Sequence, residues 1–388
     1  MENQGYKNEW SIDGGSLIWV EMIHKGDMKL IKSVIGMPFK DHFFTNHNQS
    51  ISFYINSKTK EEISKISYEK YKNPEFIKNL MALSKEIEDK IKKITEEINK
   101  DLTNKINHEL FDLLNKYFDA YAELAGVYRL TRDTFFYRII QELEKQVPKP
   151  KKENITLLLN NDLDKISFKI NQEIKDIAVS LKKVGKRRFD MHNIYLDAFI
   201  KSRKLFEEIG RRLNLTLLEA KNCTLNELKE FLINKKEIPS QELENRIKYF
   251  KFVYEEDDFE IITRQDKDEK QDSETKEIKG QTAHPGYAKG NVRIVKETLN
   301  GPLIDTINKF KEGEILVART TSPDMIPAAK KAKAIVTDVG GLLCHAAIVS
   351  REFGIPCIVG TNTASRIFKD GDLVEVNADK GIVRKIKS

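Results

Sequence analysis

Hydrophobic residues recur at every third or fourth position along a stretch that begins near Pro74, and Lys and Glu dominate the positions between them. Such spacing places the apolar side chains on one face of a helix. We therefore expect one long helix, or two nearly collinear helices, from residue 74 towards Gly126. The apolar face would consist of Leu80, Leu83, Ile87, Ile91, Ile94, Ile98, Leu102, Ile106, Leu110 and Leu113.

The rest of the N-terminal region is also expected to be mainly helical. Apolar spacing predicts helices over residues 128–147, 154–184 and 190–213, and Gly185 with the three bases after it would interrupt the second. Thr224 and Glu227 have the spacing of a capping box, which favours the start of a further helix. Residues 16–20 and 51–55 have the composition of short strands or extended segments.

Three histidines, His24, His42 and His47, lie in this first part of the chain. Their spacing matches no metal-ligand pattern and few acidic residues lie between them. We expect ordinary surface histidines here.

The composition of the chain changes at residue 255. Acidic residues dominate the following stretch, and apolar residues are almost absent after Ile262. A segment of this kind buries too little surface to fold alone. We therefore expect a charged flexible linker over residues 255–280, between a mainly helical region, residues 1–254, and a compact domain, residues 281–388.

Short apolar runs separated by turns fill the C-terminal domain. The run at residues 334–337 is followed by Gly340 and Gly341, which permit a tight turn, and then by helix formers that end at Gly354. This order predicts a strand, a glycine turn and a helix. The full set of expected strands lies near residues 292–295, 315–318, 334–337, 357–359 and 373–376.

His345 falls in the first turn of the expected helix. Backbone N–H groups are unpaired there and the helix dipole is positive, so a phosphate on His345 would gain ~0.3–2 kcal/mol from the dipole. A neutral imidazole is also a competent nucleophile. The pattern predicts a histidine that accepts and passes on a phosphoryl group, although a surface or capping histidine would occupy the same position.

The longer string TDVGGLLCHAAIVSREFGIP, residues 337–356, resembles the phosphohistidine domain of the phosphoenolpyruvate-utilising enzymes. The pattern of that family, which includes phosphoenolpyruvate synthase, pyruvate phosphate dikinase and rifampicin phosphotransferase, is T-D-x-G-G-x-T-[SC]-H-A-A-I-x-A-R-E-x-G-I-P. Residues 284–286, 315–318, 321–324 and 370–372 fit as well. One departure from the pattern matters, because Leu343 stands where the family usually has Thr.

The resemblance implies a swivelling β/β/α fold for residues 281–388. It also implies a relay in which an ATP-grasp domain phosphorylates the histidine from ATP with Mg²⁺. Neither an ATP-grasp region nor a glycine-rich phosphate loop is recognised upstream, so we expect the nucleotide and its metal on a partner chain. Residues 1–254 would then dock the partner or hold an acceptor, as in the helical acceptor domain of rifampicin phosphotransferase.

The expected function is therefore that of a phosphotransferase component with His345 as its catalytic residue. Gly340 and Gly341 would cradle the phosphate through backbone N–H groups, Thr337 and Arg351 would be further phosphate contacts, and no metal ligands are expected on this chain. Arg351 would equally well pair with a neighbouring acid. The alternative is a non-catalytic phosphocarrier, a regulatory module or an inactive remnant, which Leu343 favours.

Charge and cysteine content restrict the class of protein further. The net charge of +6 comes from Lys residues interleaved with Glu, which gives no indication of nucleic-acid binding. Three scattered cysteines, Cys223, Cys344 and Cys357, match neither a disulfide framework nor a metal site. No apolar run reaches the length of a membrane span and no secretory signal is recognised, so we expect a cytoplasmic protein without a membrane partner.

Overall fold

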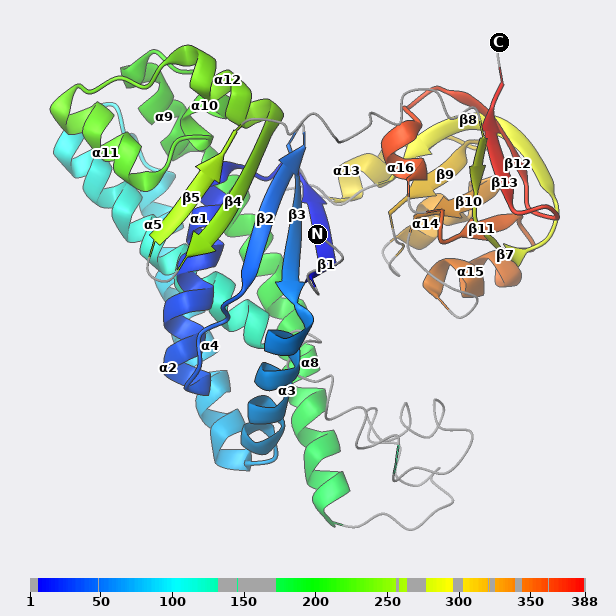
Figure 1. Cartoon of the computed structure of the whole chain (residues 1–388), viewed down its shortest axis with the longest axis horizontal. Coiled ribbons are helices and arrows are strands. Elements are labelled where there is room, and N and C mark those ends of the chain that lie inside the picture. Colours follow the sequence, from blue (N-terminus) through cyan, green and yellow to red (C-terminus); the bar gives the residue numbers. More distant parts are fainter. Residues whose placement is uncertain are drawn as a thin grey trace. The chain divides into compact units, whose positions relative to one another are not determined.

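The computed structural model describes residues 6–47, 49–131, 145, 172–255, 258–263, 277–295, 303–319, 321, 325–338, 344–361 and 363–386. The chain forms two compact units, Met1–Arg264 and Gln265–Ser388. Each unit has its own sheet and its own helices, so each is described separately (Figure 1).

An antiparallel sheet of five strands organises unit 1, in the order β1-β3-β2-β4-β5. It joins the start of the unit to its end, because β2 pairs with β4 in a register that places Phe44 opposite Phe252. The strands are β1 (Tyr6–Asp13), β2 (His42–His47), β3 (Ser50–Asn56), β4 (Tyr249–Glu255) and β5 (Asp258–Ile262). The mainly helical prediction for residues 1–254 therefore missed most of a sheet, although β3 confirms the strand expected at 51–55.

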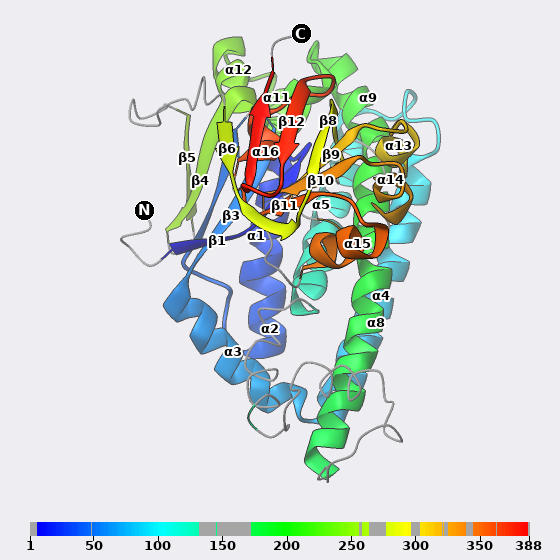
Figure 2. The same cartoon turned by 90° about the vertical axis from the view of Figure 1, so that its right-hand side faces the viewer.

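The helices of unit 1 cover one face of this sheet, as the two perpendicular views show (Figures 1 and 2). Inward-facing strand residues such as Phe44, Phe53 and Phe252 are fully buried beneath them. The helical segments are α1 (Leu17–Lys25), the π-helix Gly26–Leu30, α2 (Ile31–Ile35), α3 (Ser57–Tyr71), α4 (Pro74–Ile98), α5 (Asn107–Leu130), α8 (Gln172–Lys201), α9 (Arg203–Leu213), α10 (Leu217–Lys221), α11 (Leu225–Asn234) and α12 (Ser240–Lys248).

The long apolar repeat forms a helical hairpin, and the expectation of one helix or two collinear helices was wrong. Helices α4 and α5 pack against each other, and an ion pair with 2.7 Å between Lys90 Nζ and Glu123 Oε2 links them. Between them, Asp101 Oδ1 accepts a hydrogen bond from the Thr103 backbone at 3.0 Å, a local bond that competes with the helix. The apolar spacing continues across the turn because Leu102 is itself buried there.

Two other local predictions for unit 1 were also wrong. Residues 17–20 belong to α1 and are all buried, so the run has no periodicity that separates helix from strand. Helix α8 continues through Gly185, because the bases after it are accommodated on its surface: Arg187 reaches Glu88 at 2.8 Å and Ser84 Oγ at 2.8 Å on α4.

The capping box at Thr224 and Glu227 is confirmed at the start of α11. Most of the helix expected at 128–147 and the start of that expected at 154–184 lie outside the described residues.

His24 and His42 are buried, which corrects the expectation of surface histidines. Their rings are in hydrogen-bond contact, with 3.3 Å between His24 Nδ1 and His42 Nε2. Beside them lies the buried ion pair of Asp27 and Arg129, with 2.5 Å between Oδ1 and Nε. Both histidines lie on buried faces, His24 on α1, which packs against α5, and His42 on the central strand β2 of the sheet, which explains this environment.

An eight-stranded mixed sheet forms unit 2, in the order β6-β13-β12-β8-β9-β10-β11-β7. Strands β8, β9, β10 and β11 are parallel neighbours and the other pairs are antiparallel. The strands are β6 (Glu277–Lys279), β7 (Gln281–His284), β8 (Tyr287–Ile294), β9 (Ile315–Ala318), β10 (Ala334–Thr337), β11 (Cys357–Val359), β12 (Leu373–Asn377) and β13 (Ile382–Lys385). All five strands expected in this region are confirmed.

The central strands of unit 2 are covered on both faces. Leu316 and Ile335 belong to a core cluster that also includes Ala346 and Ala347 of α15 (His345–Phe353), while Val317 and Val336 face a second cluster. Continuous apolar runs are typical of parallel strands buried on both sides. The remaining helices are α13 (Leu303–Asn308), α14 (Ile326–Ala329) and α16 (Ala364–Ile367).

The range 255–280 was too wide for a linker. Residues 258–262 form β5, which pairs with β4, and residues 277–279 form β6, which pairs with β13. Phe259 and Ile261 alternate with polar residues at one end of the range, and Ile278 is a buried apolar residue between two charged ones at the other, so each short piece can join an existing sheet. Residues 264–276, where flexibility was expected, lie outside the described residues.

Candidate functional site

His345 is the first residue of α15, the helix that follows β10 along the chain. Cys344 precedes it in an extended conformation, and Gly354 ends the helix with a left-handed φ of 65°. Helix α15 packs on β7, β10 and β11. The strand and helix of the predicted motif are therefore confirmed, whereas the glycine turn, with Gly340, Gly341 and Leu343, lies outside the described residues.

The imidazole of His345 is half-buried and held from one side. Its Nδ1 lies 3.0 Å from the Thr321 hydroxyl oxygen, while no hydrogen bond from a described residue reaches Nε2. Burial lowers the pKa of His345 below its ordinary value, because a charged ring loses water there, and the negative charge of Glu352 opposes this effect. The ring is therefore mainly neutral at pH 7, with a lone pair available for nucleophilic attack.

Thr321 is a site residue to which the sequence analysis gave no role. It lies in the loop that follows β9, the parallel neighbour of β10, so the carboxyl ends of the two strands bring Thr321 and His345 together. Ligand sites in parallel sheets occur at this edge. The signal available in the sequence was the position of residues 321–324 directly after an apolar strand.

Two other predicted phosphate contacts, Thr337 and Arg351, lie in the described part of unit 2. Thr337 ends β10 with 1% of its surface exposed, and its hydroxyl has no hydrogen-bond partner among the described atoms. Arg351 is exposed in the last turn of α15, six residues and about 9 Å along the helix axis from His345. The structure therefore brings neither side chain into a described contact with His345, and their phosphate-binding roles stay predictions.

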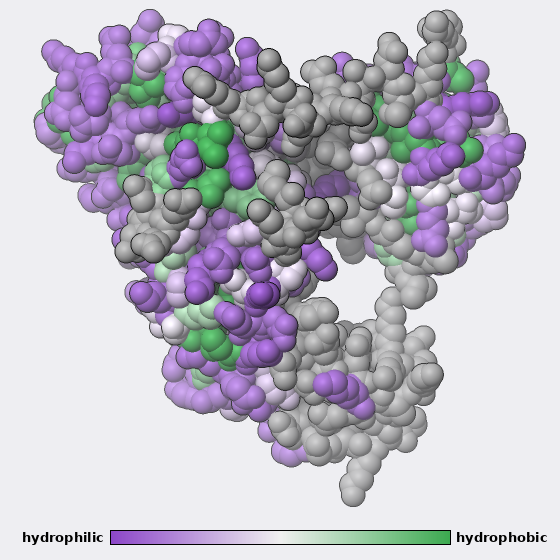
Figure 3. Space-filling view, in the orientation of Figure 1, coloured by the Kyte–Doolittle hydropathy of each residue, from purple (hydrophilic) through white to green (hydrophobic). Residues whose placement is uncertain are grey.

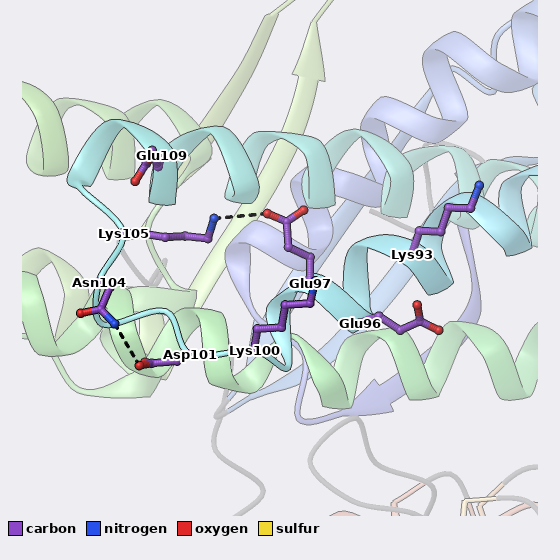
Figure 4. Close-up of a pocket in the computed structure, with 8 residues that line it drawn as sticks. All are labelled: Lys93, Glu96, Glu97, Lys100, Asp101, Asn104, Lys105 and Glu109. Carbon is purple, nitrogen blue, oxygen red and sulfur yellow. Dashed lines mark hydrogen bonds and ion pairs between the residues drawn. The ribbon is translucent and has the colours of Figure 1, made fainter.

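Unit 1 has an open polar hollow at the turn between α4 and α5 (Figure 4). Lys105 Nζ lies 3.3 Å from Glu97 Oε1 across it, and Asn104 donates to Asp101 at 3.3 Å. Lysines and carboxylates alternate around the hollow: the lining residues are Lys93, Glu96, Glu97, Lys100, Asp101, Asn104, Lys105 and Glu109. Such a mixture indicates no ligand of a particular charge.

The described residues give three further findings. Hydrophilic residues dominate the face of unit 1 seen in Figure 3, and hydrophobic areas are small and separate. Within the described ranges, no helix has the length and apolar character needed to cross a membrane. The same ranges contain no group of three His, Cys, Asp or Glu side chains that could hold a metal ion, so they offer Mg²⁺ no site of that kind.

Comparison with known proteins finds a family match in unit 2. Residues 310–381 match the family described as "PEP-utilising enzyme, mobile domain", where PEP is phosphoenolpyruvate. A probable phosphoenolpyruvate synthase of Archaeoglobus fulgidus is 51% identical over 27% of this chain, and one of Methanothermobacter thermautotrophicus is 47% identical over 27%. The chain spans only 13% and 15% of the length of these relatives.

Among solved structures, an Enzyme I protein, described as nEIt, is 15% identical and aligns with 84% of this chain and 81% of its own, with a TM-score of 0.22. That likeness is too remote to carry an argument. The sequence matches, together with the parallel strands and the helix that begins at His345, identify the C-terminal unit of this chain as a mobile domain of the PEP-utilising enzyme family.

Proposed function

We propose that His345 carries a phosphoryl group on Nε2 during phosphoryl transfer between two other sites. The observation that supports this most strongly is the asymmetric environment of its ring: Nδ1 is 3.0 Å from the Thr321 hydroxyl, and no described residue bonds Nε2. If Nδ1–H donates to Thr321 Oγ1, the lone pair of the neutral ring lies on Nε2.

The chemical step follows from that tautomer. Nε2 attacks the phosphorus atom, an Nε2–P bond forms, and the bond from phosphorus to the leaving oxygen breaks with its electron pair remaining on the departing phosphate. The hydroxyl oxygen of Thr321 accepts the hydrogen bond from Nδ1–H while positive charge develops on the ring. The N-terminus of α15 adds unpaired backbone N–H groups and a positive dipole end beside the dianionic phosphoryl group. Transfer to the acceptor reverses these bond changes.

The donor in this proposal is an ATP-grasp protein that binds ATP with Mg²⁺, because the described part of unit 1 offers helices and an antiparallel sheet but no recognisable nucleotide loop. The metal would neutralise the phosphates of the nucleotide, and the residues that hold it would belong to the partner. Unit 1 would dock that partner or hold the acceptor. The two relatives are named as probable phosphoenolpyruvate synthases, which agrees with a small metabolite as the phosphoryl acceptor.

A second candidate is a phosphocarrier that accepts the group without passing it to a small molecule. Leu343 in place of the family Thr favours it, because a hydroxyl near the phosphoryl group is missing.

The relay is tested by incubating the protein with ATP, Mg²⁺ and candidate ATP-grasp proteins, followed by mass spectrometry at neutral pH. We expect one added phosphoryl group only when a competent partner is present, and none on the His345→Ala variant. Adding candidate acceptors to the isolated phosphoprotein then separates the two candidates, since a relay loses the group to an acceptor and a carrier retains it. Autophosphorylation of the chain without any partner would refute the proposal that the ATP site lies on a partner protein.

A further inference from the structure

A buried carboxylate lies where the loop to His345 leaves the sheet. Asp338 directly follows β10 and is 4% exposed. Its Oδ1 accepts hydrogen bonds from Thr361 Oγ1 at 2.9 Å and from the Ser365 backbone at 3.1 Å, and its Oδ2 accepts one from the Ser365 hydroxyl. Bonds to an ionised carboxylate are roughly twice as strong as neutral ones. Three of them fix the orientation of this side chain.

Asp338 joins the loops that follow three neighbouring strands. Thr361 and Ser365 belong to the segment after β11, and the backbone N–H of Thr361 donates to the Thr337 carbonyl at 3.1 Å. The hydroxyl of Thr361 has a single proton, which is shared between Asp338 Oδ1 at 2.9 Å and the Thr337 carbonyl at 3.1 Å. On the other side, the Asp338 backbone N–H donates to the Ala318 carbonyl at 3.1 Å. Ala318 ends β9, three residues before Thr321.

The two halves of the candidate site therefore share one anchor. Thr321 extends from the β9 end that Asp338 holds through its backbone, and His345 extends from the β10 end to which Asp338 itself belongs. Burial of a carboxylate carries a desolvation cost that an apolar residue of similar volume would avoid. A requirement for fixed orientation of the loops explains a charged residue at this position better than stability alone.

We propose that Asp338 is a positioning residue for His345: by joining the ends of β9, β10 and β11, it keeps Thr321 Oγ1 within hydrogen-bond distance of His345 Nδ1. Thr361 and Ser365 are its partners in this role. The inference rests on the proposed function of His345 for its importance, but the geometric claim concerns the ring and its tautomer and is measured without any phosphoryl transfer.

The test compares Asp338→Asn and Thr361→Val with Thr361→Ser, which retains the hydroxyl. Asp370→Asn is the matched control, because Asp370 also accepts bonds from a backbone N–H, that of Ile294 at 2.6 Å, and from a side chain, that of Arg293 at 3.1 Å, within unit 2. The first readout is the ¹⁵N chemical shifts of the His345 ring, which report the tautomer. The second is the initial rate of His345 phosphorylation by phosphoramidate, a small donor whose P–N bond breaks with release of ammonia.

We expect Asp338→Asn and Thr361→Val to reduce the population of the Nδ1–H tautomer and to slow labelling about 2- to 13-fold, because their largest effect is the loss of the one neutral hydrogen bond between Thr321 and His345. Thr361→Ser should restore both readouts, and Asp370→Asn should leave both unchanged even if its melting temperature falls. Parent-like shifts and rates in folded Thr361→Val would overturn the proposal, and this variant decides the matter if Asp338→Asn does not fold. If the parent protein itself is not labelled, the proposed function fails, while the tautomer comparison still decides the role of Asp338.

Discussion

Replacing Thr321 by Val tests how the ring of His345 is prepared for attack. Valine has nearly the shape of threonine but lacks the hydroxyl, so the change removes the contact of 3.0 Å to His345 Nδ1 with little change in volume. Both side chains are half-buried, which limits the effect on the fold of unit 2. The variant should therefore fold and retain its melting temperature within a few degrees.

The magnitude follows from the energy of one hydrogen bond. A neutral hydrogen bond contributes about 0.5–1.5 kcal/mol net. If all of it orients the ring and selects the Nδ1–H tautomer, its loss raises the barrier by the same amount, and labelling at Nε2 slows about 2- to 13-fold. Thr321→Ser keeps the hydroxyl and should recover most of the rate.

The assay is the initial rate of phosphoramidate labelling at pH 7.5, with each histidine followed by peptide mass spectrometry. Labelling of His108, which is exposed near the start of α5 in unit 1, provides an internal control for the reagent. Equal His345 rates in the parent and in Thr321→Val would show that the hydroxyl does not prepare the ring, and this part of the reasoning would then be wrong.

Three further outcomes are expected. The rate of His345 labelling should rise with pH to a plateau with its midpoint below 6.5, because burial lowers the pKa of the ring; a midpoint above 6.5 would contradict this. Burial lowers the pKa of His24 to about 4, so between pH 6.5 and pH 4 only the unfolded state binds a proton on this ring. Urea unfolding should therefore show that about 3 kcal/mol of stability is present above pH 6.5 and is lost as the pH falls to 4. The loss should be smaller in His24→Leu. In thermal melting, Gly26→Ala should destabilise unit 1 by about 1–3 kcal/mol, because the added Cβ would lie 2.1 Å from the carbonyl oxygen of Ala122. Gly185→Ala should instead stabilise α8 by about 0.5–1 kcal/mol, because no atom lies within 4 Å of the added Cβ.

The strands of unit 2 were predictable because they are short, apolar and separated by turns. Strand β10 and helix α15 lie within a residue of the predicted positions, and Gly354 ends the helix in the left-handed conformation that the sequence suggested. In this part of the chain, local preferences and the final fold agree, which makes sequence reasoning effective.

Unit 1 was less predictable because tertiary pairing decides its structure. Strand β2 contains His42, Asn46 and His47, which are not typical strand residues, and it is stabilised by pairing with β3 and β4. Strand β4 lies about two hundred residues further along the chain, so no local pattern indicates the partnership. The turn between α4 and α5 was hidden for a related reason, since buried Leu102 continues the apolar spacing through it.

The candidate site was predictable only where its residues adjoin in sequence. His345 follows from the motif, whereas the contact with Thr321 depends on β9 and β10 being parallel neighbours. The link from Asp338 to Thr361 and Ser365 likewise depends on the order of the strands in the sheet. Sequence gives the residue types at such a site, and the sheet decides which of them meet.

The most direct measurement of the central claim is the location of the phosphoryl group among the seven histidines of the chain after brief phosphoramidate treatment. We predict that His345 is labelled first, on Nε2, as shown by ³¹P NMR and peptide mass spectrometry, and that the label is acid-labile, alkali-stable and absent from His345→Ala. Labelling of His345 no faster than that of exposed His108, or equal total early labelling of the parent and His345→Ala, would contradict the account.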